Sequence, residues 1–173
     1  MKVLVTVKEV AAVDDEFEID GLAIDDRYLS YDLNEWDEYA IEAAVQISEA
    51  REDVEVVTVT VGGPDTEETI RQALAKGADR AVRVWDDALA SAGLLDPATK
   101  ATVLSAVVEE EDPDLILTGV QAADDGFGAT GVTLASAIGW EWAAVVNSLD
   151  LDTEAGVARS EEHTSELQSL SHI

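Results

Sequence analysis

The stretch PDLILTGVQAADDGFGATGVTLASAIG, residues 113 to 139, has the pattern of a buried strand that leads through a glycine-rich loop into a helix. The apolar run at residues 115–117 predicts the strand, and the run at residues 132–139 predicts the helix. Between them, glycine stands at Gly119, Gly126, Gly128 and Gly131. The stretch therefore predicts one strand–loop–helix unit of an α/β protein.

The loop of this unit combines features that attract and repel an anion. A helix N-terminus presents unpaired N–H groups and a partial positive charge, and glycines let an anion approach the backbone, which suits a phosphate. Asp124 and Asp125 repel a phosphate unless they face elsewhere, for example to cap N–H groups or to accept from ribose hydroxyls. From these residues alone, a nucleotide site and a plain glycine-rich helix start both stay open.

The same alternation of strands and helices runs along most of the chain. Strands are predicted at residues 1–7, 54–61, 78–85, 113–119 and 142–152, and helices at residues 34–51, 66–77, 97–111 and 132–139. Asn34 is predicted to cap the first helix, and residues 11–33 to form an irregular connection or a short hairpin. This order favours an α/β fold, doubly wound, with a mainly parallel sheet in a single Rossmann-like domain. Ligands of such sheets bind outside the carboxyl ends of the strands, here from Lys8 onward, at residues 62–64 and at residues 119–130.

The charge of the chain excludes several partners. There are 38 acidic against 10 basic residues, a formal net charge of -28, and a hydrophobic share of 47% that still permits a packed core. Nucleic acid and anionic membrane surfaces both need a basic footprint, so neither is an expected partner. Such an acidic surface is typical of a halophile. The start of the chain fits neither a signal peptide nor a membrane span, and a cytoplasmic location is expected.

Motifs for catalysis and metal binding are not found in the sequence. It has no cysteine, no G-x-x-x-x-G-K-[ST] run, and no G-x-G-x-x-G after the first strand. The two histidines, His163 and His172, both lie near the end of the chain. Acid pairs such as residues 14–15 and 86–87 are predicted to be solvated surface rather than Mg²⁺ sites. No catalytic residue and no metal ligand is predicted.

Several segments in the right order resemble one family, the beta subunit of electron transfer flavoprotein. They are KVLVTVK (residues 2–8), NEWDEYAIEAAV (34–45), GGPDTEETIRQALAKGADRAVRV (62–84) and GVQAADDGFGATG (119–131). The resemblance implies an electron carrier subunit rather than an enzyme, in a heterodimer with an alpha subunit. It implies AMP in this subunit and FAD shared with the alpha subunit. It also implies electrons that pass from flavin dehydrogenases, such as those of fatty acid oxidation, toward a quinone oxidoreductase.

The resemblance also implies which residues bind the cofactor. By motif position, the AMP pocket would include Thr6, Asn34, Glu35, Trp36, Asp37 and Gly62, with Gly119, Val120, Gln121, Ala122, Ala123, Asp124, Asp125, Gly126, Phe127, Gly128, Ala129 and Thr130 around the phosphate. The sequence departs from the family where Val120 replaces a frequent Lys, and where Gly128 and Ala129 replace a frequent Asn-Gln pair. Backbone groups would therefore carry more of the phosphate binding.

Two other functions remain open from the sequence. One is a flavin-bifurcating relative that holds a second FAD where AMP would lie. The other is an ATP-using enzyme or a stress-type nucleotide-binding protein of similar topology, although the Ser-Gly-Gly loop expected of the enzyme after the first strand is replaced by EVAAVDD.

The end of the chain differs from the rest. Residues 159–169 resemble the translation of a sequencing-library adapter, and no strand or helix is predicted there. We therefore expect a nucleotide-binding domain at residues 1–158, whose natural C-terminal part is missing, and a non-native tail at residues 159–173.

Overall fold

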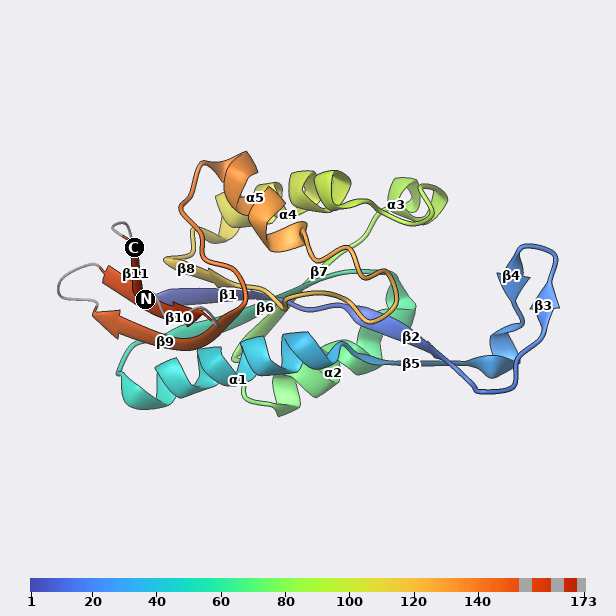
Figure 1. Ribbon diagram of the computed structural model, residues 1–173, viewed down its shortest axis with the longest axis horizontal. Helices are drawn as coiled ribbons and strands as arrows, with labels where there is room; N and C mark the ends of the chain where they lie inside the picture. Colours follow the sequence, from blue (N-terminus) through green and yellow to red (C-terminus); the bar gives the residue numbers. More distant parts are fainter. Residues whose placement is uncertain (153–156, 163–166, 171–173) are drawn as a thin grey trace.

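A four-stranded parallel sheet forms the centre of the protein (Figure 1). The structure, a computed structural model, describes residues 1–152, 157–162 and 167–170. The strands are β1 (Lys2–Thr6), β6 (Glu55–Val61), β7 (Arg80–Val84) and β8 (Leu115–Leu117), in the order β7-β6-β1-β8. From β1 the chain first builds outward to β6 and β7, and then returns to the other side of β1 for β8. The predicted α/β fold with a mainly parallel sheet is confirmed.

Helices cover both faces of this sheet. The described helices are α1 (Glu35–Ala50), α2 (Glu67–Ala75), α3 (Asp87–Ser91), α4 (Pro97–Glu111) and α5 (Thr130–Ile138), with short 3-10 turns η1 (Asp26–Tyr28) and η2 (Pro64–Thr66). α1 and α2 lie on one face, and α4 and α5 on the other (Figure 1). α3 lies in a segment that was predicted as loop; the side chain of Asp86 caps it by accepting from the N–H of Ala88. No helix in the described part of the chain is long and apolar enough to cross a membrane.

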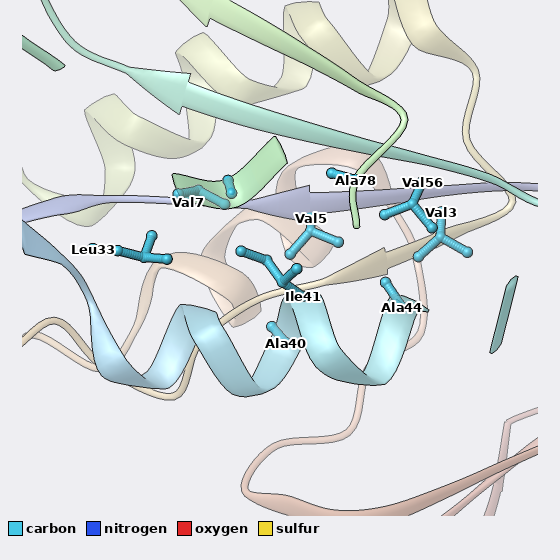
Figure 2. Packing of buried hydrophobic residues seen from close by; sticks show 10 residues of the cluster. Val3, Val5, Val7, Leu33, Ala40, Ile41, Ala44, Val56 and Ala78 are labelled. Atoms are coloured by element: carbon cyan, nitrogen blue, oxygen red, sulfur yellow. The ribbon is translucent and has the colours of Figure 1, made fainter. Parts of the chain in front are cut away.

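The core has one layer on each face because β1 is apolar on both sides. Val3 and Val5 point toward α1, where Ala44 and Ile41 lie (Figure 2), whereas Leu4 packs with Leu104 of α4. All three β1 side chains are fully buried. Burying each of them contributes about 1.5–3 kcal/mol. A strand buried on both faces reads as a continuous apolar run, which is why the sequence predicted it well.

An antiparallel arm separates β1 from α1. β2 (Glu9–Val13) pairs with β5 (Leu29–Leu33), and the tip carries the small pair β3 (Ile19–Asp20) and β4 (Ala23–Ile24). In Figure 1 this arm extends away from the sheet beyond the carboxyl ends of its strands. At its base, the N–H of Asn34 donates to the carbonyl of Lys8 over 3.0 Å. Residues 11–33 are therefore part of a hairpin rather than an irregular connection, but the hairpin is longer than the short one expected, because its first strand, β2, begins at Glu9.

A second sheet corrects two predictions about the end of the chain. β9 (Val146–Asp152), β10 (Val157–Glu162) and β11 (Leu167–Leu170) form an antiparallel sheet in the order β11-β10-β9. The strand predicted at residues 142–152 thus does not join the parallel sheet, because its hydrogen-bonding partner is β10. The expectation of no strand after residue 158 is also wrong for the described residues. In β10, Ala158 and Ser160 are buried and Arg159 is exposed, which is the alternation expected of a strand. The sequence did not show this alternation, because the buried residue at position 160 is a polar serine. That residues 159–173 are non-native stays a prediction.

Candidate functional site

The strand order defines where a ligand would bind. Successive crossovers lead from β1 to β6 and β7 on one side, and the chain then reverses to place β8 on the other side of β1. In doubly wound sheets, ligands bind in the crevice outside the carboxyl ends of the strands, at this point of reversal. A cavity of about 110 Å³ lies there, lined by the end of β1 at Thr6 and by Thr118 and Gly119 after β8.

Most of the residues predicted for the site line this cavity. They are Thr6, Asn34, Asp37, Gly119, Val120, Gln121, Ala122, Asp125, Gly128, Ala129 and Thr130. The other predicted residues, Glu35, Trp36, Gly62, Ala123, Asp124, Gly126 and Phe127, are not among the lining residues.

Trp36 and Gly62 have other structural roles. Trp36 is 41% exposed and its ring packs against Tyr39, with centroids 5.9 Å apart. Gly62 follows β6 directly, and a Cβ atom there would come within 2.4 Å of the Cγ2 atom of Thr66. Glycine at this position is therefore explained by close packing on η2. The predicted binding point at residues 62–64 lies outside the lining of the cavity.

The prediction missed several lining residues. An apolar group consists of Val7, Val59, Val61, Leu95 and Leu104; the polar additions are Lys100, Thr118 and Lys8, which had been predicted only as the start of a binding point. Lys8 lies two residues after the end of β1, and Lys100 lies in the first turn of α4 after the N-cap Asp96. Both positions bring a basic side chain to the edge where ligands bind. Their place at that edge was the available signal.

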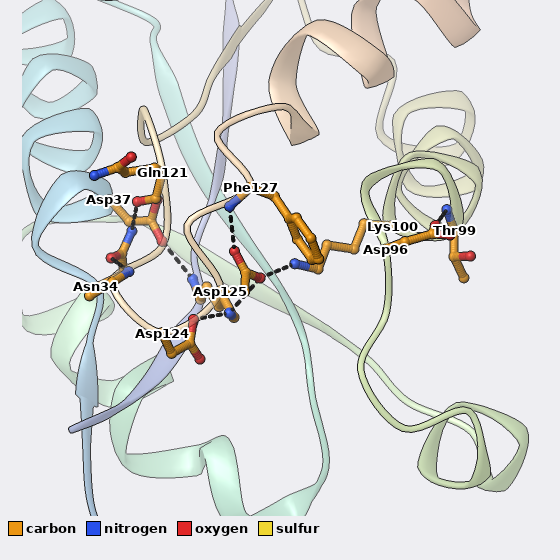
Figure 3. Close-up of polar contacts among 11 residues, drawn as sticks. Asn34, Asp37, Asp96, Thr99, Lys100, Gln121, Asp124, Asp125 and Phe127 are labelled. Atoms are coloured by element: carbon orange, nitrogen blue, oxygen red, sulfur yellow. Dashed lines mark hydrogen bonds and ion pairs between the residues drawn. The ribbon is translucent and has the colours of Figure 1, made fainter. Parts of the chain in front are cut away.

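Asn34 fastens the glycine-rich loop to the start of α1. Its Nδ2 atom donates to the carbonyl of Gln121 over 2.9 Å, and its Oδ1 atom accepts from the N–H of Ala123 over 3.3 Å (Figure 3). Asn34 is only 1% exposed, and its side chain makes no capping bond to α1. Asn34 is thus the N-cap residue of α1, as predicted, but the prediction that its side chain caps the helix is wrong.

Asp37 joins β1, α1 and the loop after β8. Its Oδ2 atom accepts from the N–H of Lys8 over 2.8 Å, and the side chain is buried at 5% exposure. Burial raises the pKa of Asp37 to about 6, although hydrogen bonds from the backbone of Lys8, from Asn34 and from the backbone of Gly119 favour the charged form. Several donors therefore hold the carboxyl group of Asp37, although its removal from water costs free energy when it is ionised.

The glycines of the loop have two distinct reasons. At Gly119, a Cβ atom would come within 2.1 Å of the Oδ1 atom of Asp37, and at Gly131 within 2.4 Å of the Oγ1 atom of Thr118. These two permit close approach of elements. Gly126 and Gly128 instead have φ of +61° and +58°, a region that side chains rarely adopt. Close packing accounts for Gly119 and Gly131, and backbone conformation accounts for Gly126 and Gly128.

The two adjacent acids pair with the two lysines (Figure 3). The Oδ2 atom of Asp125 lies 2.6 Å from the Nζ atom of Lys100 and 2.9 Å from that of Lys8, which also pairs with Asp124. The Oδ1 atom of Asp125 accepts from the N–H of Phe127 over 3.1 Å. Burial works to raise the pKa of Asp125, but the bonds from Lys100 and Lys8 outweigh it and lower that pKa to about 2.

The cavity has an apolar floor and a polar rim. Val59, Val61 and Leu104 face it from the sheet and α4, while Thr130 opens α5 at its edge. Such a combination suits a small organic ligand with a flat apolar part and a polar end. Among the described residues, no group of three or more acidic or histidine side chains is placed to hold a metal ion. The chain is thus an α/β protein with a candidate small-ligand site at the reversal of its strand order.

Comparisons with known proteins identify the family. A sequence model described as "Electron transfer flavoprotein domain" matches residues 21–171. The chain is 44% identical over 168 residues to the electron transfer flavoprotein subunit beta of Methylophilus methylotrophus, covering 94% of this chain and 62% of that protein. For the subunit beta of Bradyrhizobium diazoefficiens the identity is 37% over 154 residues, covering 88% and 60%. The human subunit beta is 35% identical over 154 residues, with the same coverage of 88% and 60%.

The chain belongs to the electron transfer flavoprotein family. The relatives it matches are beta subunits, and the chain spans about three fifths of their length.

Proposed function

We propose that the chain acts as the beta subunit of a heterodimeric electron transfer flavoprotein, an electron carrier rather than an enzyme. In this role it binds AMP and, with an alpha subunit, houses the FAD that carries electrons from flavin dehydrogenases toward a quinone oxidoreductase. The observation that carries the proposal is the 44% identity to a beta subunit over 94% of the chain.

The cavity at the reversal of the strand order supports AMP as the ligand. The apolar floor of Val59, Val61 and Leu104 suits an adenine ring, and the start of α5 at Thr130 offers N–H groups to a phosphate. Gln121 adds a polar residue to the lining of the cavity.

Binding of a nucleotide requires part of the loop at residues 119–129 to move outward. The cavity measures about 110 Å³, whereas pockets for small organic ligands measure about 300–1,000 Å³. Two hydrogen bonds of the Asn34 side chain hold Gln121 and Ala123, whereas Asp125 is held by its pairs with Lys8 and Lys100. The part of the loop that Asn34 holds can therefore be displaced while the pairs of Asp125 and the packing of the sheet are kept.

The test is mass spectrometry of small molecules released by denaturing the purified chain. The chain is purified in molar KCl, alone and together with an alpha subunit, and AMP in about one equivalent is expected. Thr130→Tyr, which fills the cavity, is expected to abolish the bound AMP. The matched variant Thr102→Tyr, on the exposed face of α4, is expected to retain it.

Other results would redirect the proposal. FAD in the chain without its partner would favour the flavin-bifurcating alternative, and ATP would favour a stress-type protein or an ATP-using enzyme. A pair with the alpha subunit that takes no electrons from a reduced flavin dehydrogenase would refute the carrier function, whichever nucleotide is bound.

A further inference from the structure

The ionisable side chains that line the cavity nearly cancel one another. They are Lys8 and Lys100 with positive charge, and Asp37 and Asp125 with negative charge when ionised. Asp124 pairs with Lys8 from just outside the lining. Among these described side chains, no positive charge is left uncompensated.

Asp125 compensates the charge of both lysines. Its side chain is 4% exposed and reaches both lysines, Lys100 at 2.6 Å and Lys8 at 2.9 Å. Lys100 is itself 15% exposed and also lies over the ring of Phe127, 5.5 Å from the centroid. Asp124, by contrast, is 26% exposed and reaches Lys8 alone of these two lysines. Because Asp125 is so well removed from water, solvent screens its charge less than that of Asp124.

This arrangement has different consequences for one phosphate and for several. Neutral donors at the rim and at the start of α5 can hold one phosphate group. Every further phosphate brings more negative charge to a cavity whose two lysines are already paired with the protein's own carboxylates. A site built for polyphosphates would instead leave such cations free to pair with the ligand.

We propose that Asp125 determines the specificity of the cavity, so that it accepts an adenine nucleotide with a single phosphate and rejects ADP, ATP and the pyrophosphate of a dinucleotide. The inference rests on the proposed function, in which this cavity holds an adenine nucleotide. It goes further by naming the residue that sets how much ligand charge is accepted. It also gives a physical reason for AMP rather than a second FAD in this subunit.

The size of the effect follows from the charge removed. At an effective dielectric constant of about 20 and a separation of about 8 Å, one unit charge changes affinity about 30-fold. Asp125→Asn removes that charge and frees Lys100 and Lys8 for the ligand. We therefore expect the ratio of dissociation constants, ADP over AMP, to fall at least tenfold in this variant.

The experiment is calorimetric titration of the nucleotide-free full chain with AMP and with ADP, without Mg²⁺. It uses the lowest KCl concentration at which circular dichroism shows the folded chain, so that charge effects are not screened away. Glu109→Gln is the matched control, because it removes one negative charge from the exposed face of α4. In the control the ADP/AMP ratio is expected to stay as in the unmodified chain.

A second variant tests the opposite direction. Lys100→Gln removes a cation and leaves Asp125 less compensated, so the ADP/AMP ratio is expected to rise. If Asp125→Asn does not fold, the ADP/AMP ratio measured for Lys100→Gln is the result that tests the proposal. A purely structural role for Asp125 would weaken both nucleotides equally and leave the ratio unchanged.

The outcomes separate the two proposals. AMP binding with a ratio that moves as described supports the specificity role. AMP binding with an unmoved ratio, or with ADP bound as tightly as AMP by the unmodified chain, overturns it and leaves the proposed function intact. If the nucleotide-free chain binds no adenine nucleotide, the proposed function fails and this inference falls with it.

Discussion

The substitution Asp37→Asn is expected to change how the stability of the protein depends on pH. Asp37 is buried between β1, α1 and the glycine-rich loop, and burial raises its pKa from 3.8 to about 6. A group whose pKa is higher in the folded than in the unfolded state favours folding while it is protonated. That contribution is complete below about pH 3.8 and is lost as the pH rises through about 6.

The magnitude follows from the two pKa values. A difference of 6 minus 3.8, about 2.2 pKa units, corresponds to about 3 kcal/mol between strongly acidic and alkaline conditions. Between pH 5 and pH 7.5, where other carboxyls are mostly ionised, the same two pKa values give a loss of about 1.4 kcal/mol. Asparagine has nearly the same shape, keeps an oxygen that can accept from the N–H of Lys8, and does not titrate.

The assay is urea unfolding of the unmodified chain and of Asp37→Asn at pH 5 and pH 7.5, in the same KCl concentration. We expect the variant to gain about 1.4 kcal/mol relative to the unmodified chain between the two pH values. Asp14→Asn, an exposed position on the arm, removes the same charge and serves as the control. Parallel pH profiles for the unmodified chain and Asp37→Asn would refute the reasoning, because they would mean that Asp37 is not buried as a costly charge.

Four further outcomes are expected. Asn34→Ala removes two hydrogen bonds that hold the loop, so we expect a loss of about 2 kcal/mol, about 4–8 °C in melting temperature, with faster hydrogen exchange at the N–H of Ala123; unchanged exchange there would contradict the contact. Gly119→Ala places a Cβ atom within 3.0 Å of the α1 backbone, so a loss of more than about 2 kcal/mol in urea unfolding is expected, and an unaffected variant would exclude the close packing. The bonds from Arg80 lower the pKa of Glu111 to about 2 from 4.5, so this stabilisation is present above pH 4.5 and lost as the pH falls toward 2. Glu111→Gln should therefore cost about 1–2 kcal/mol at pH 7, a range reduced for the exposure of Arg80, and the difference should vanish near pH 2. Raising KCl from 0.1 to 1 M should raise the melting temperature, because the screening length falls from about 10 to about 3 Å around a chain of net charge -28; a fall would argue against a halophilic surface.

The parallel sheet was predictable because its signals are local. The β1 residues Val3, Leu4 and Val5 are apolar on both faces, and each later strand is separated from the next by a helical pattern of the right length. The C-terminal strands were not predictable in the same way. Their pairing depends on a polar partner strand, and Ser160 is buried in the folded chain although its side chain is polar. Burial of that kind is a consequence of the fold rather than of composition.

The cavity was only partly predictable for a related reason. The strand order, which selects the gap between β1 and β8 instead of the end of β6, cannot be read from the alternation of strands and helices alone. Lys100 is 25 residues from its partner Asp125 in the sequence, and Lys8 is 117 residues from it. Asn34 had a plausible local role as a helix cap, but in the folded chain its side chain bonds to the loop at Gln121. Long-range polar pairing thus overrode the local preference.

The way the loop is held argues for a site that opens without loss of the fold. Its fastenings come from three elements, namely Asn34 before α1, Lys8 after β1 and Lys100 on α4. Each is a polar contact at the edge of the sheet, and because Asn34 is 1% and the side chain of Asp125 4% exposed, a ligand has to supply the polar groups that replace the lost partners. The apolar layers beneath, by contrast, hold the strand ends themselves in place. In the proposed site, a ligand that supplies its own polar groups can therefore displace the part of the loop that Asn34 holds, while the ends of β1 and β8 keep the shape of the floor.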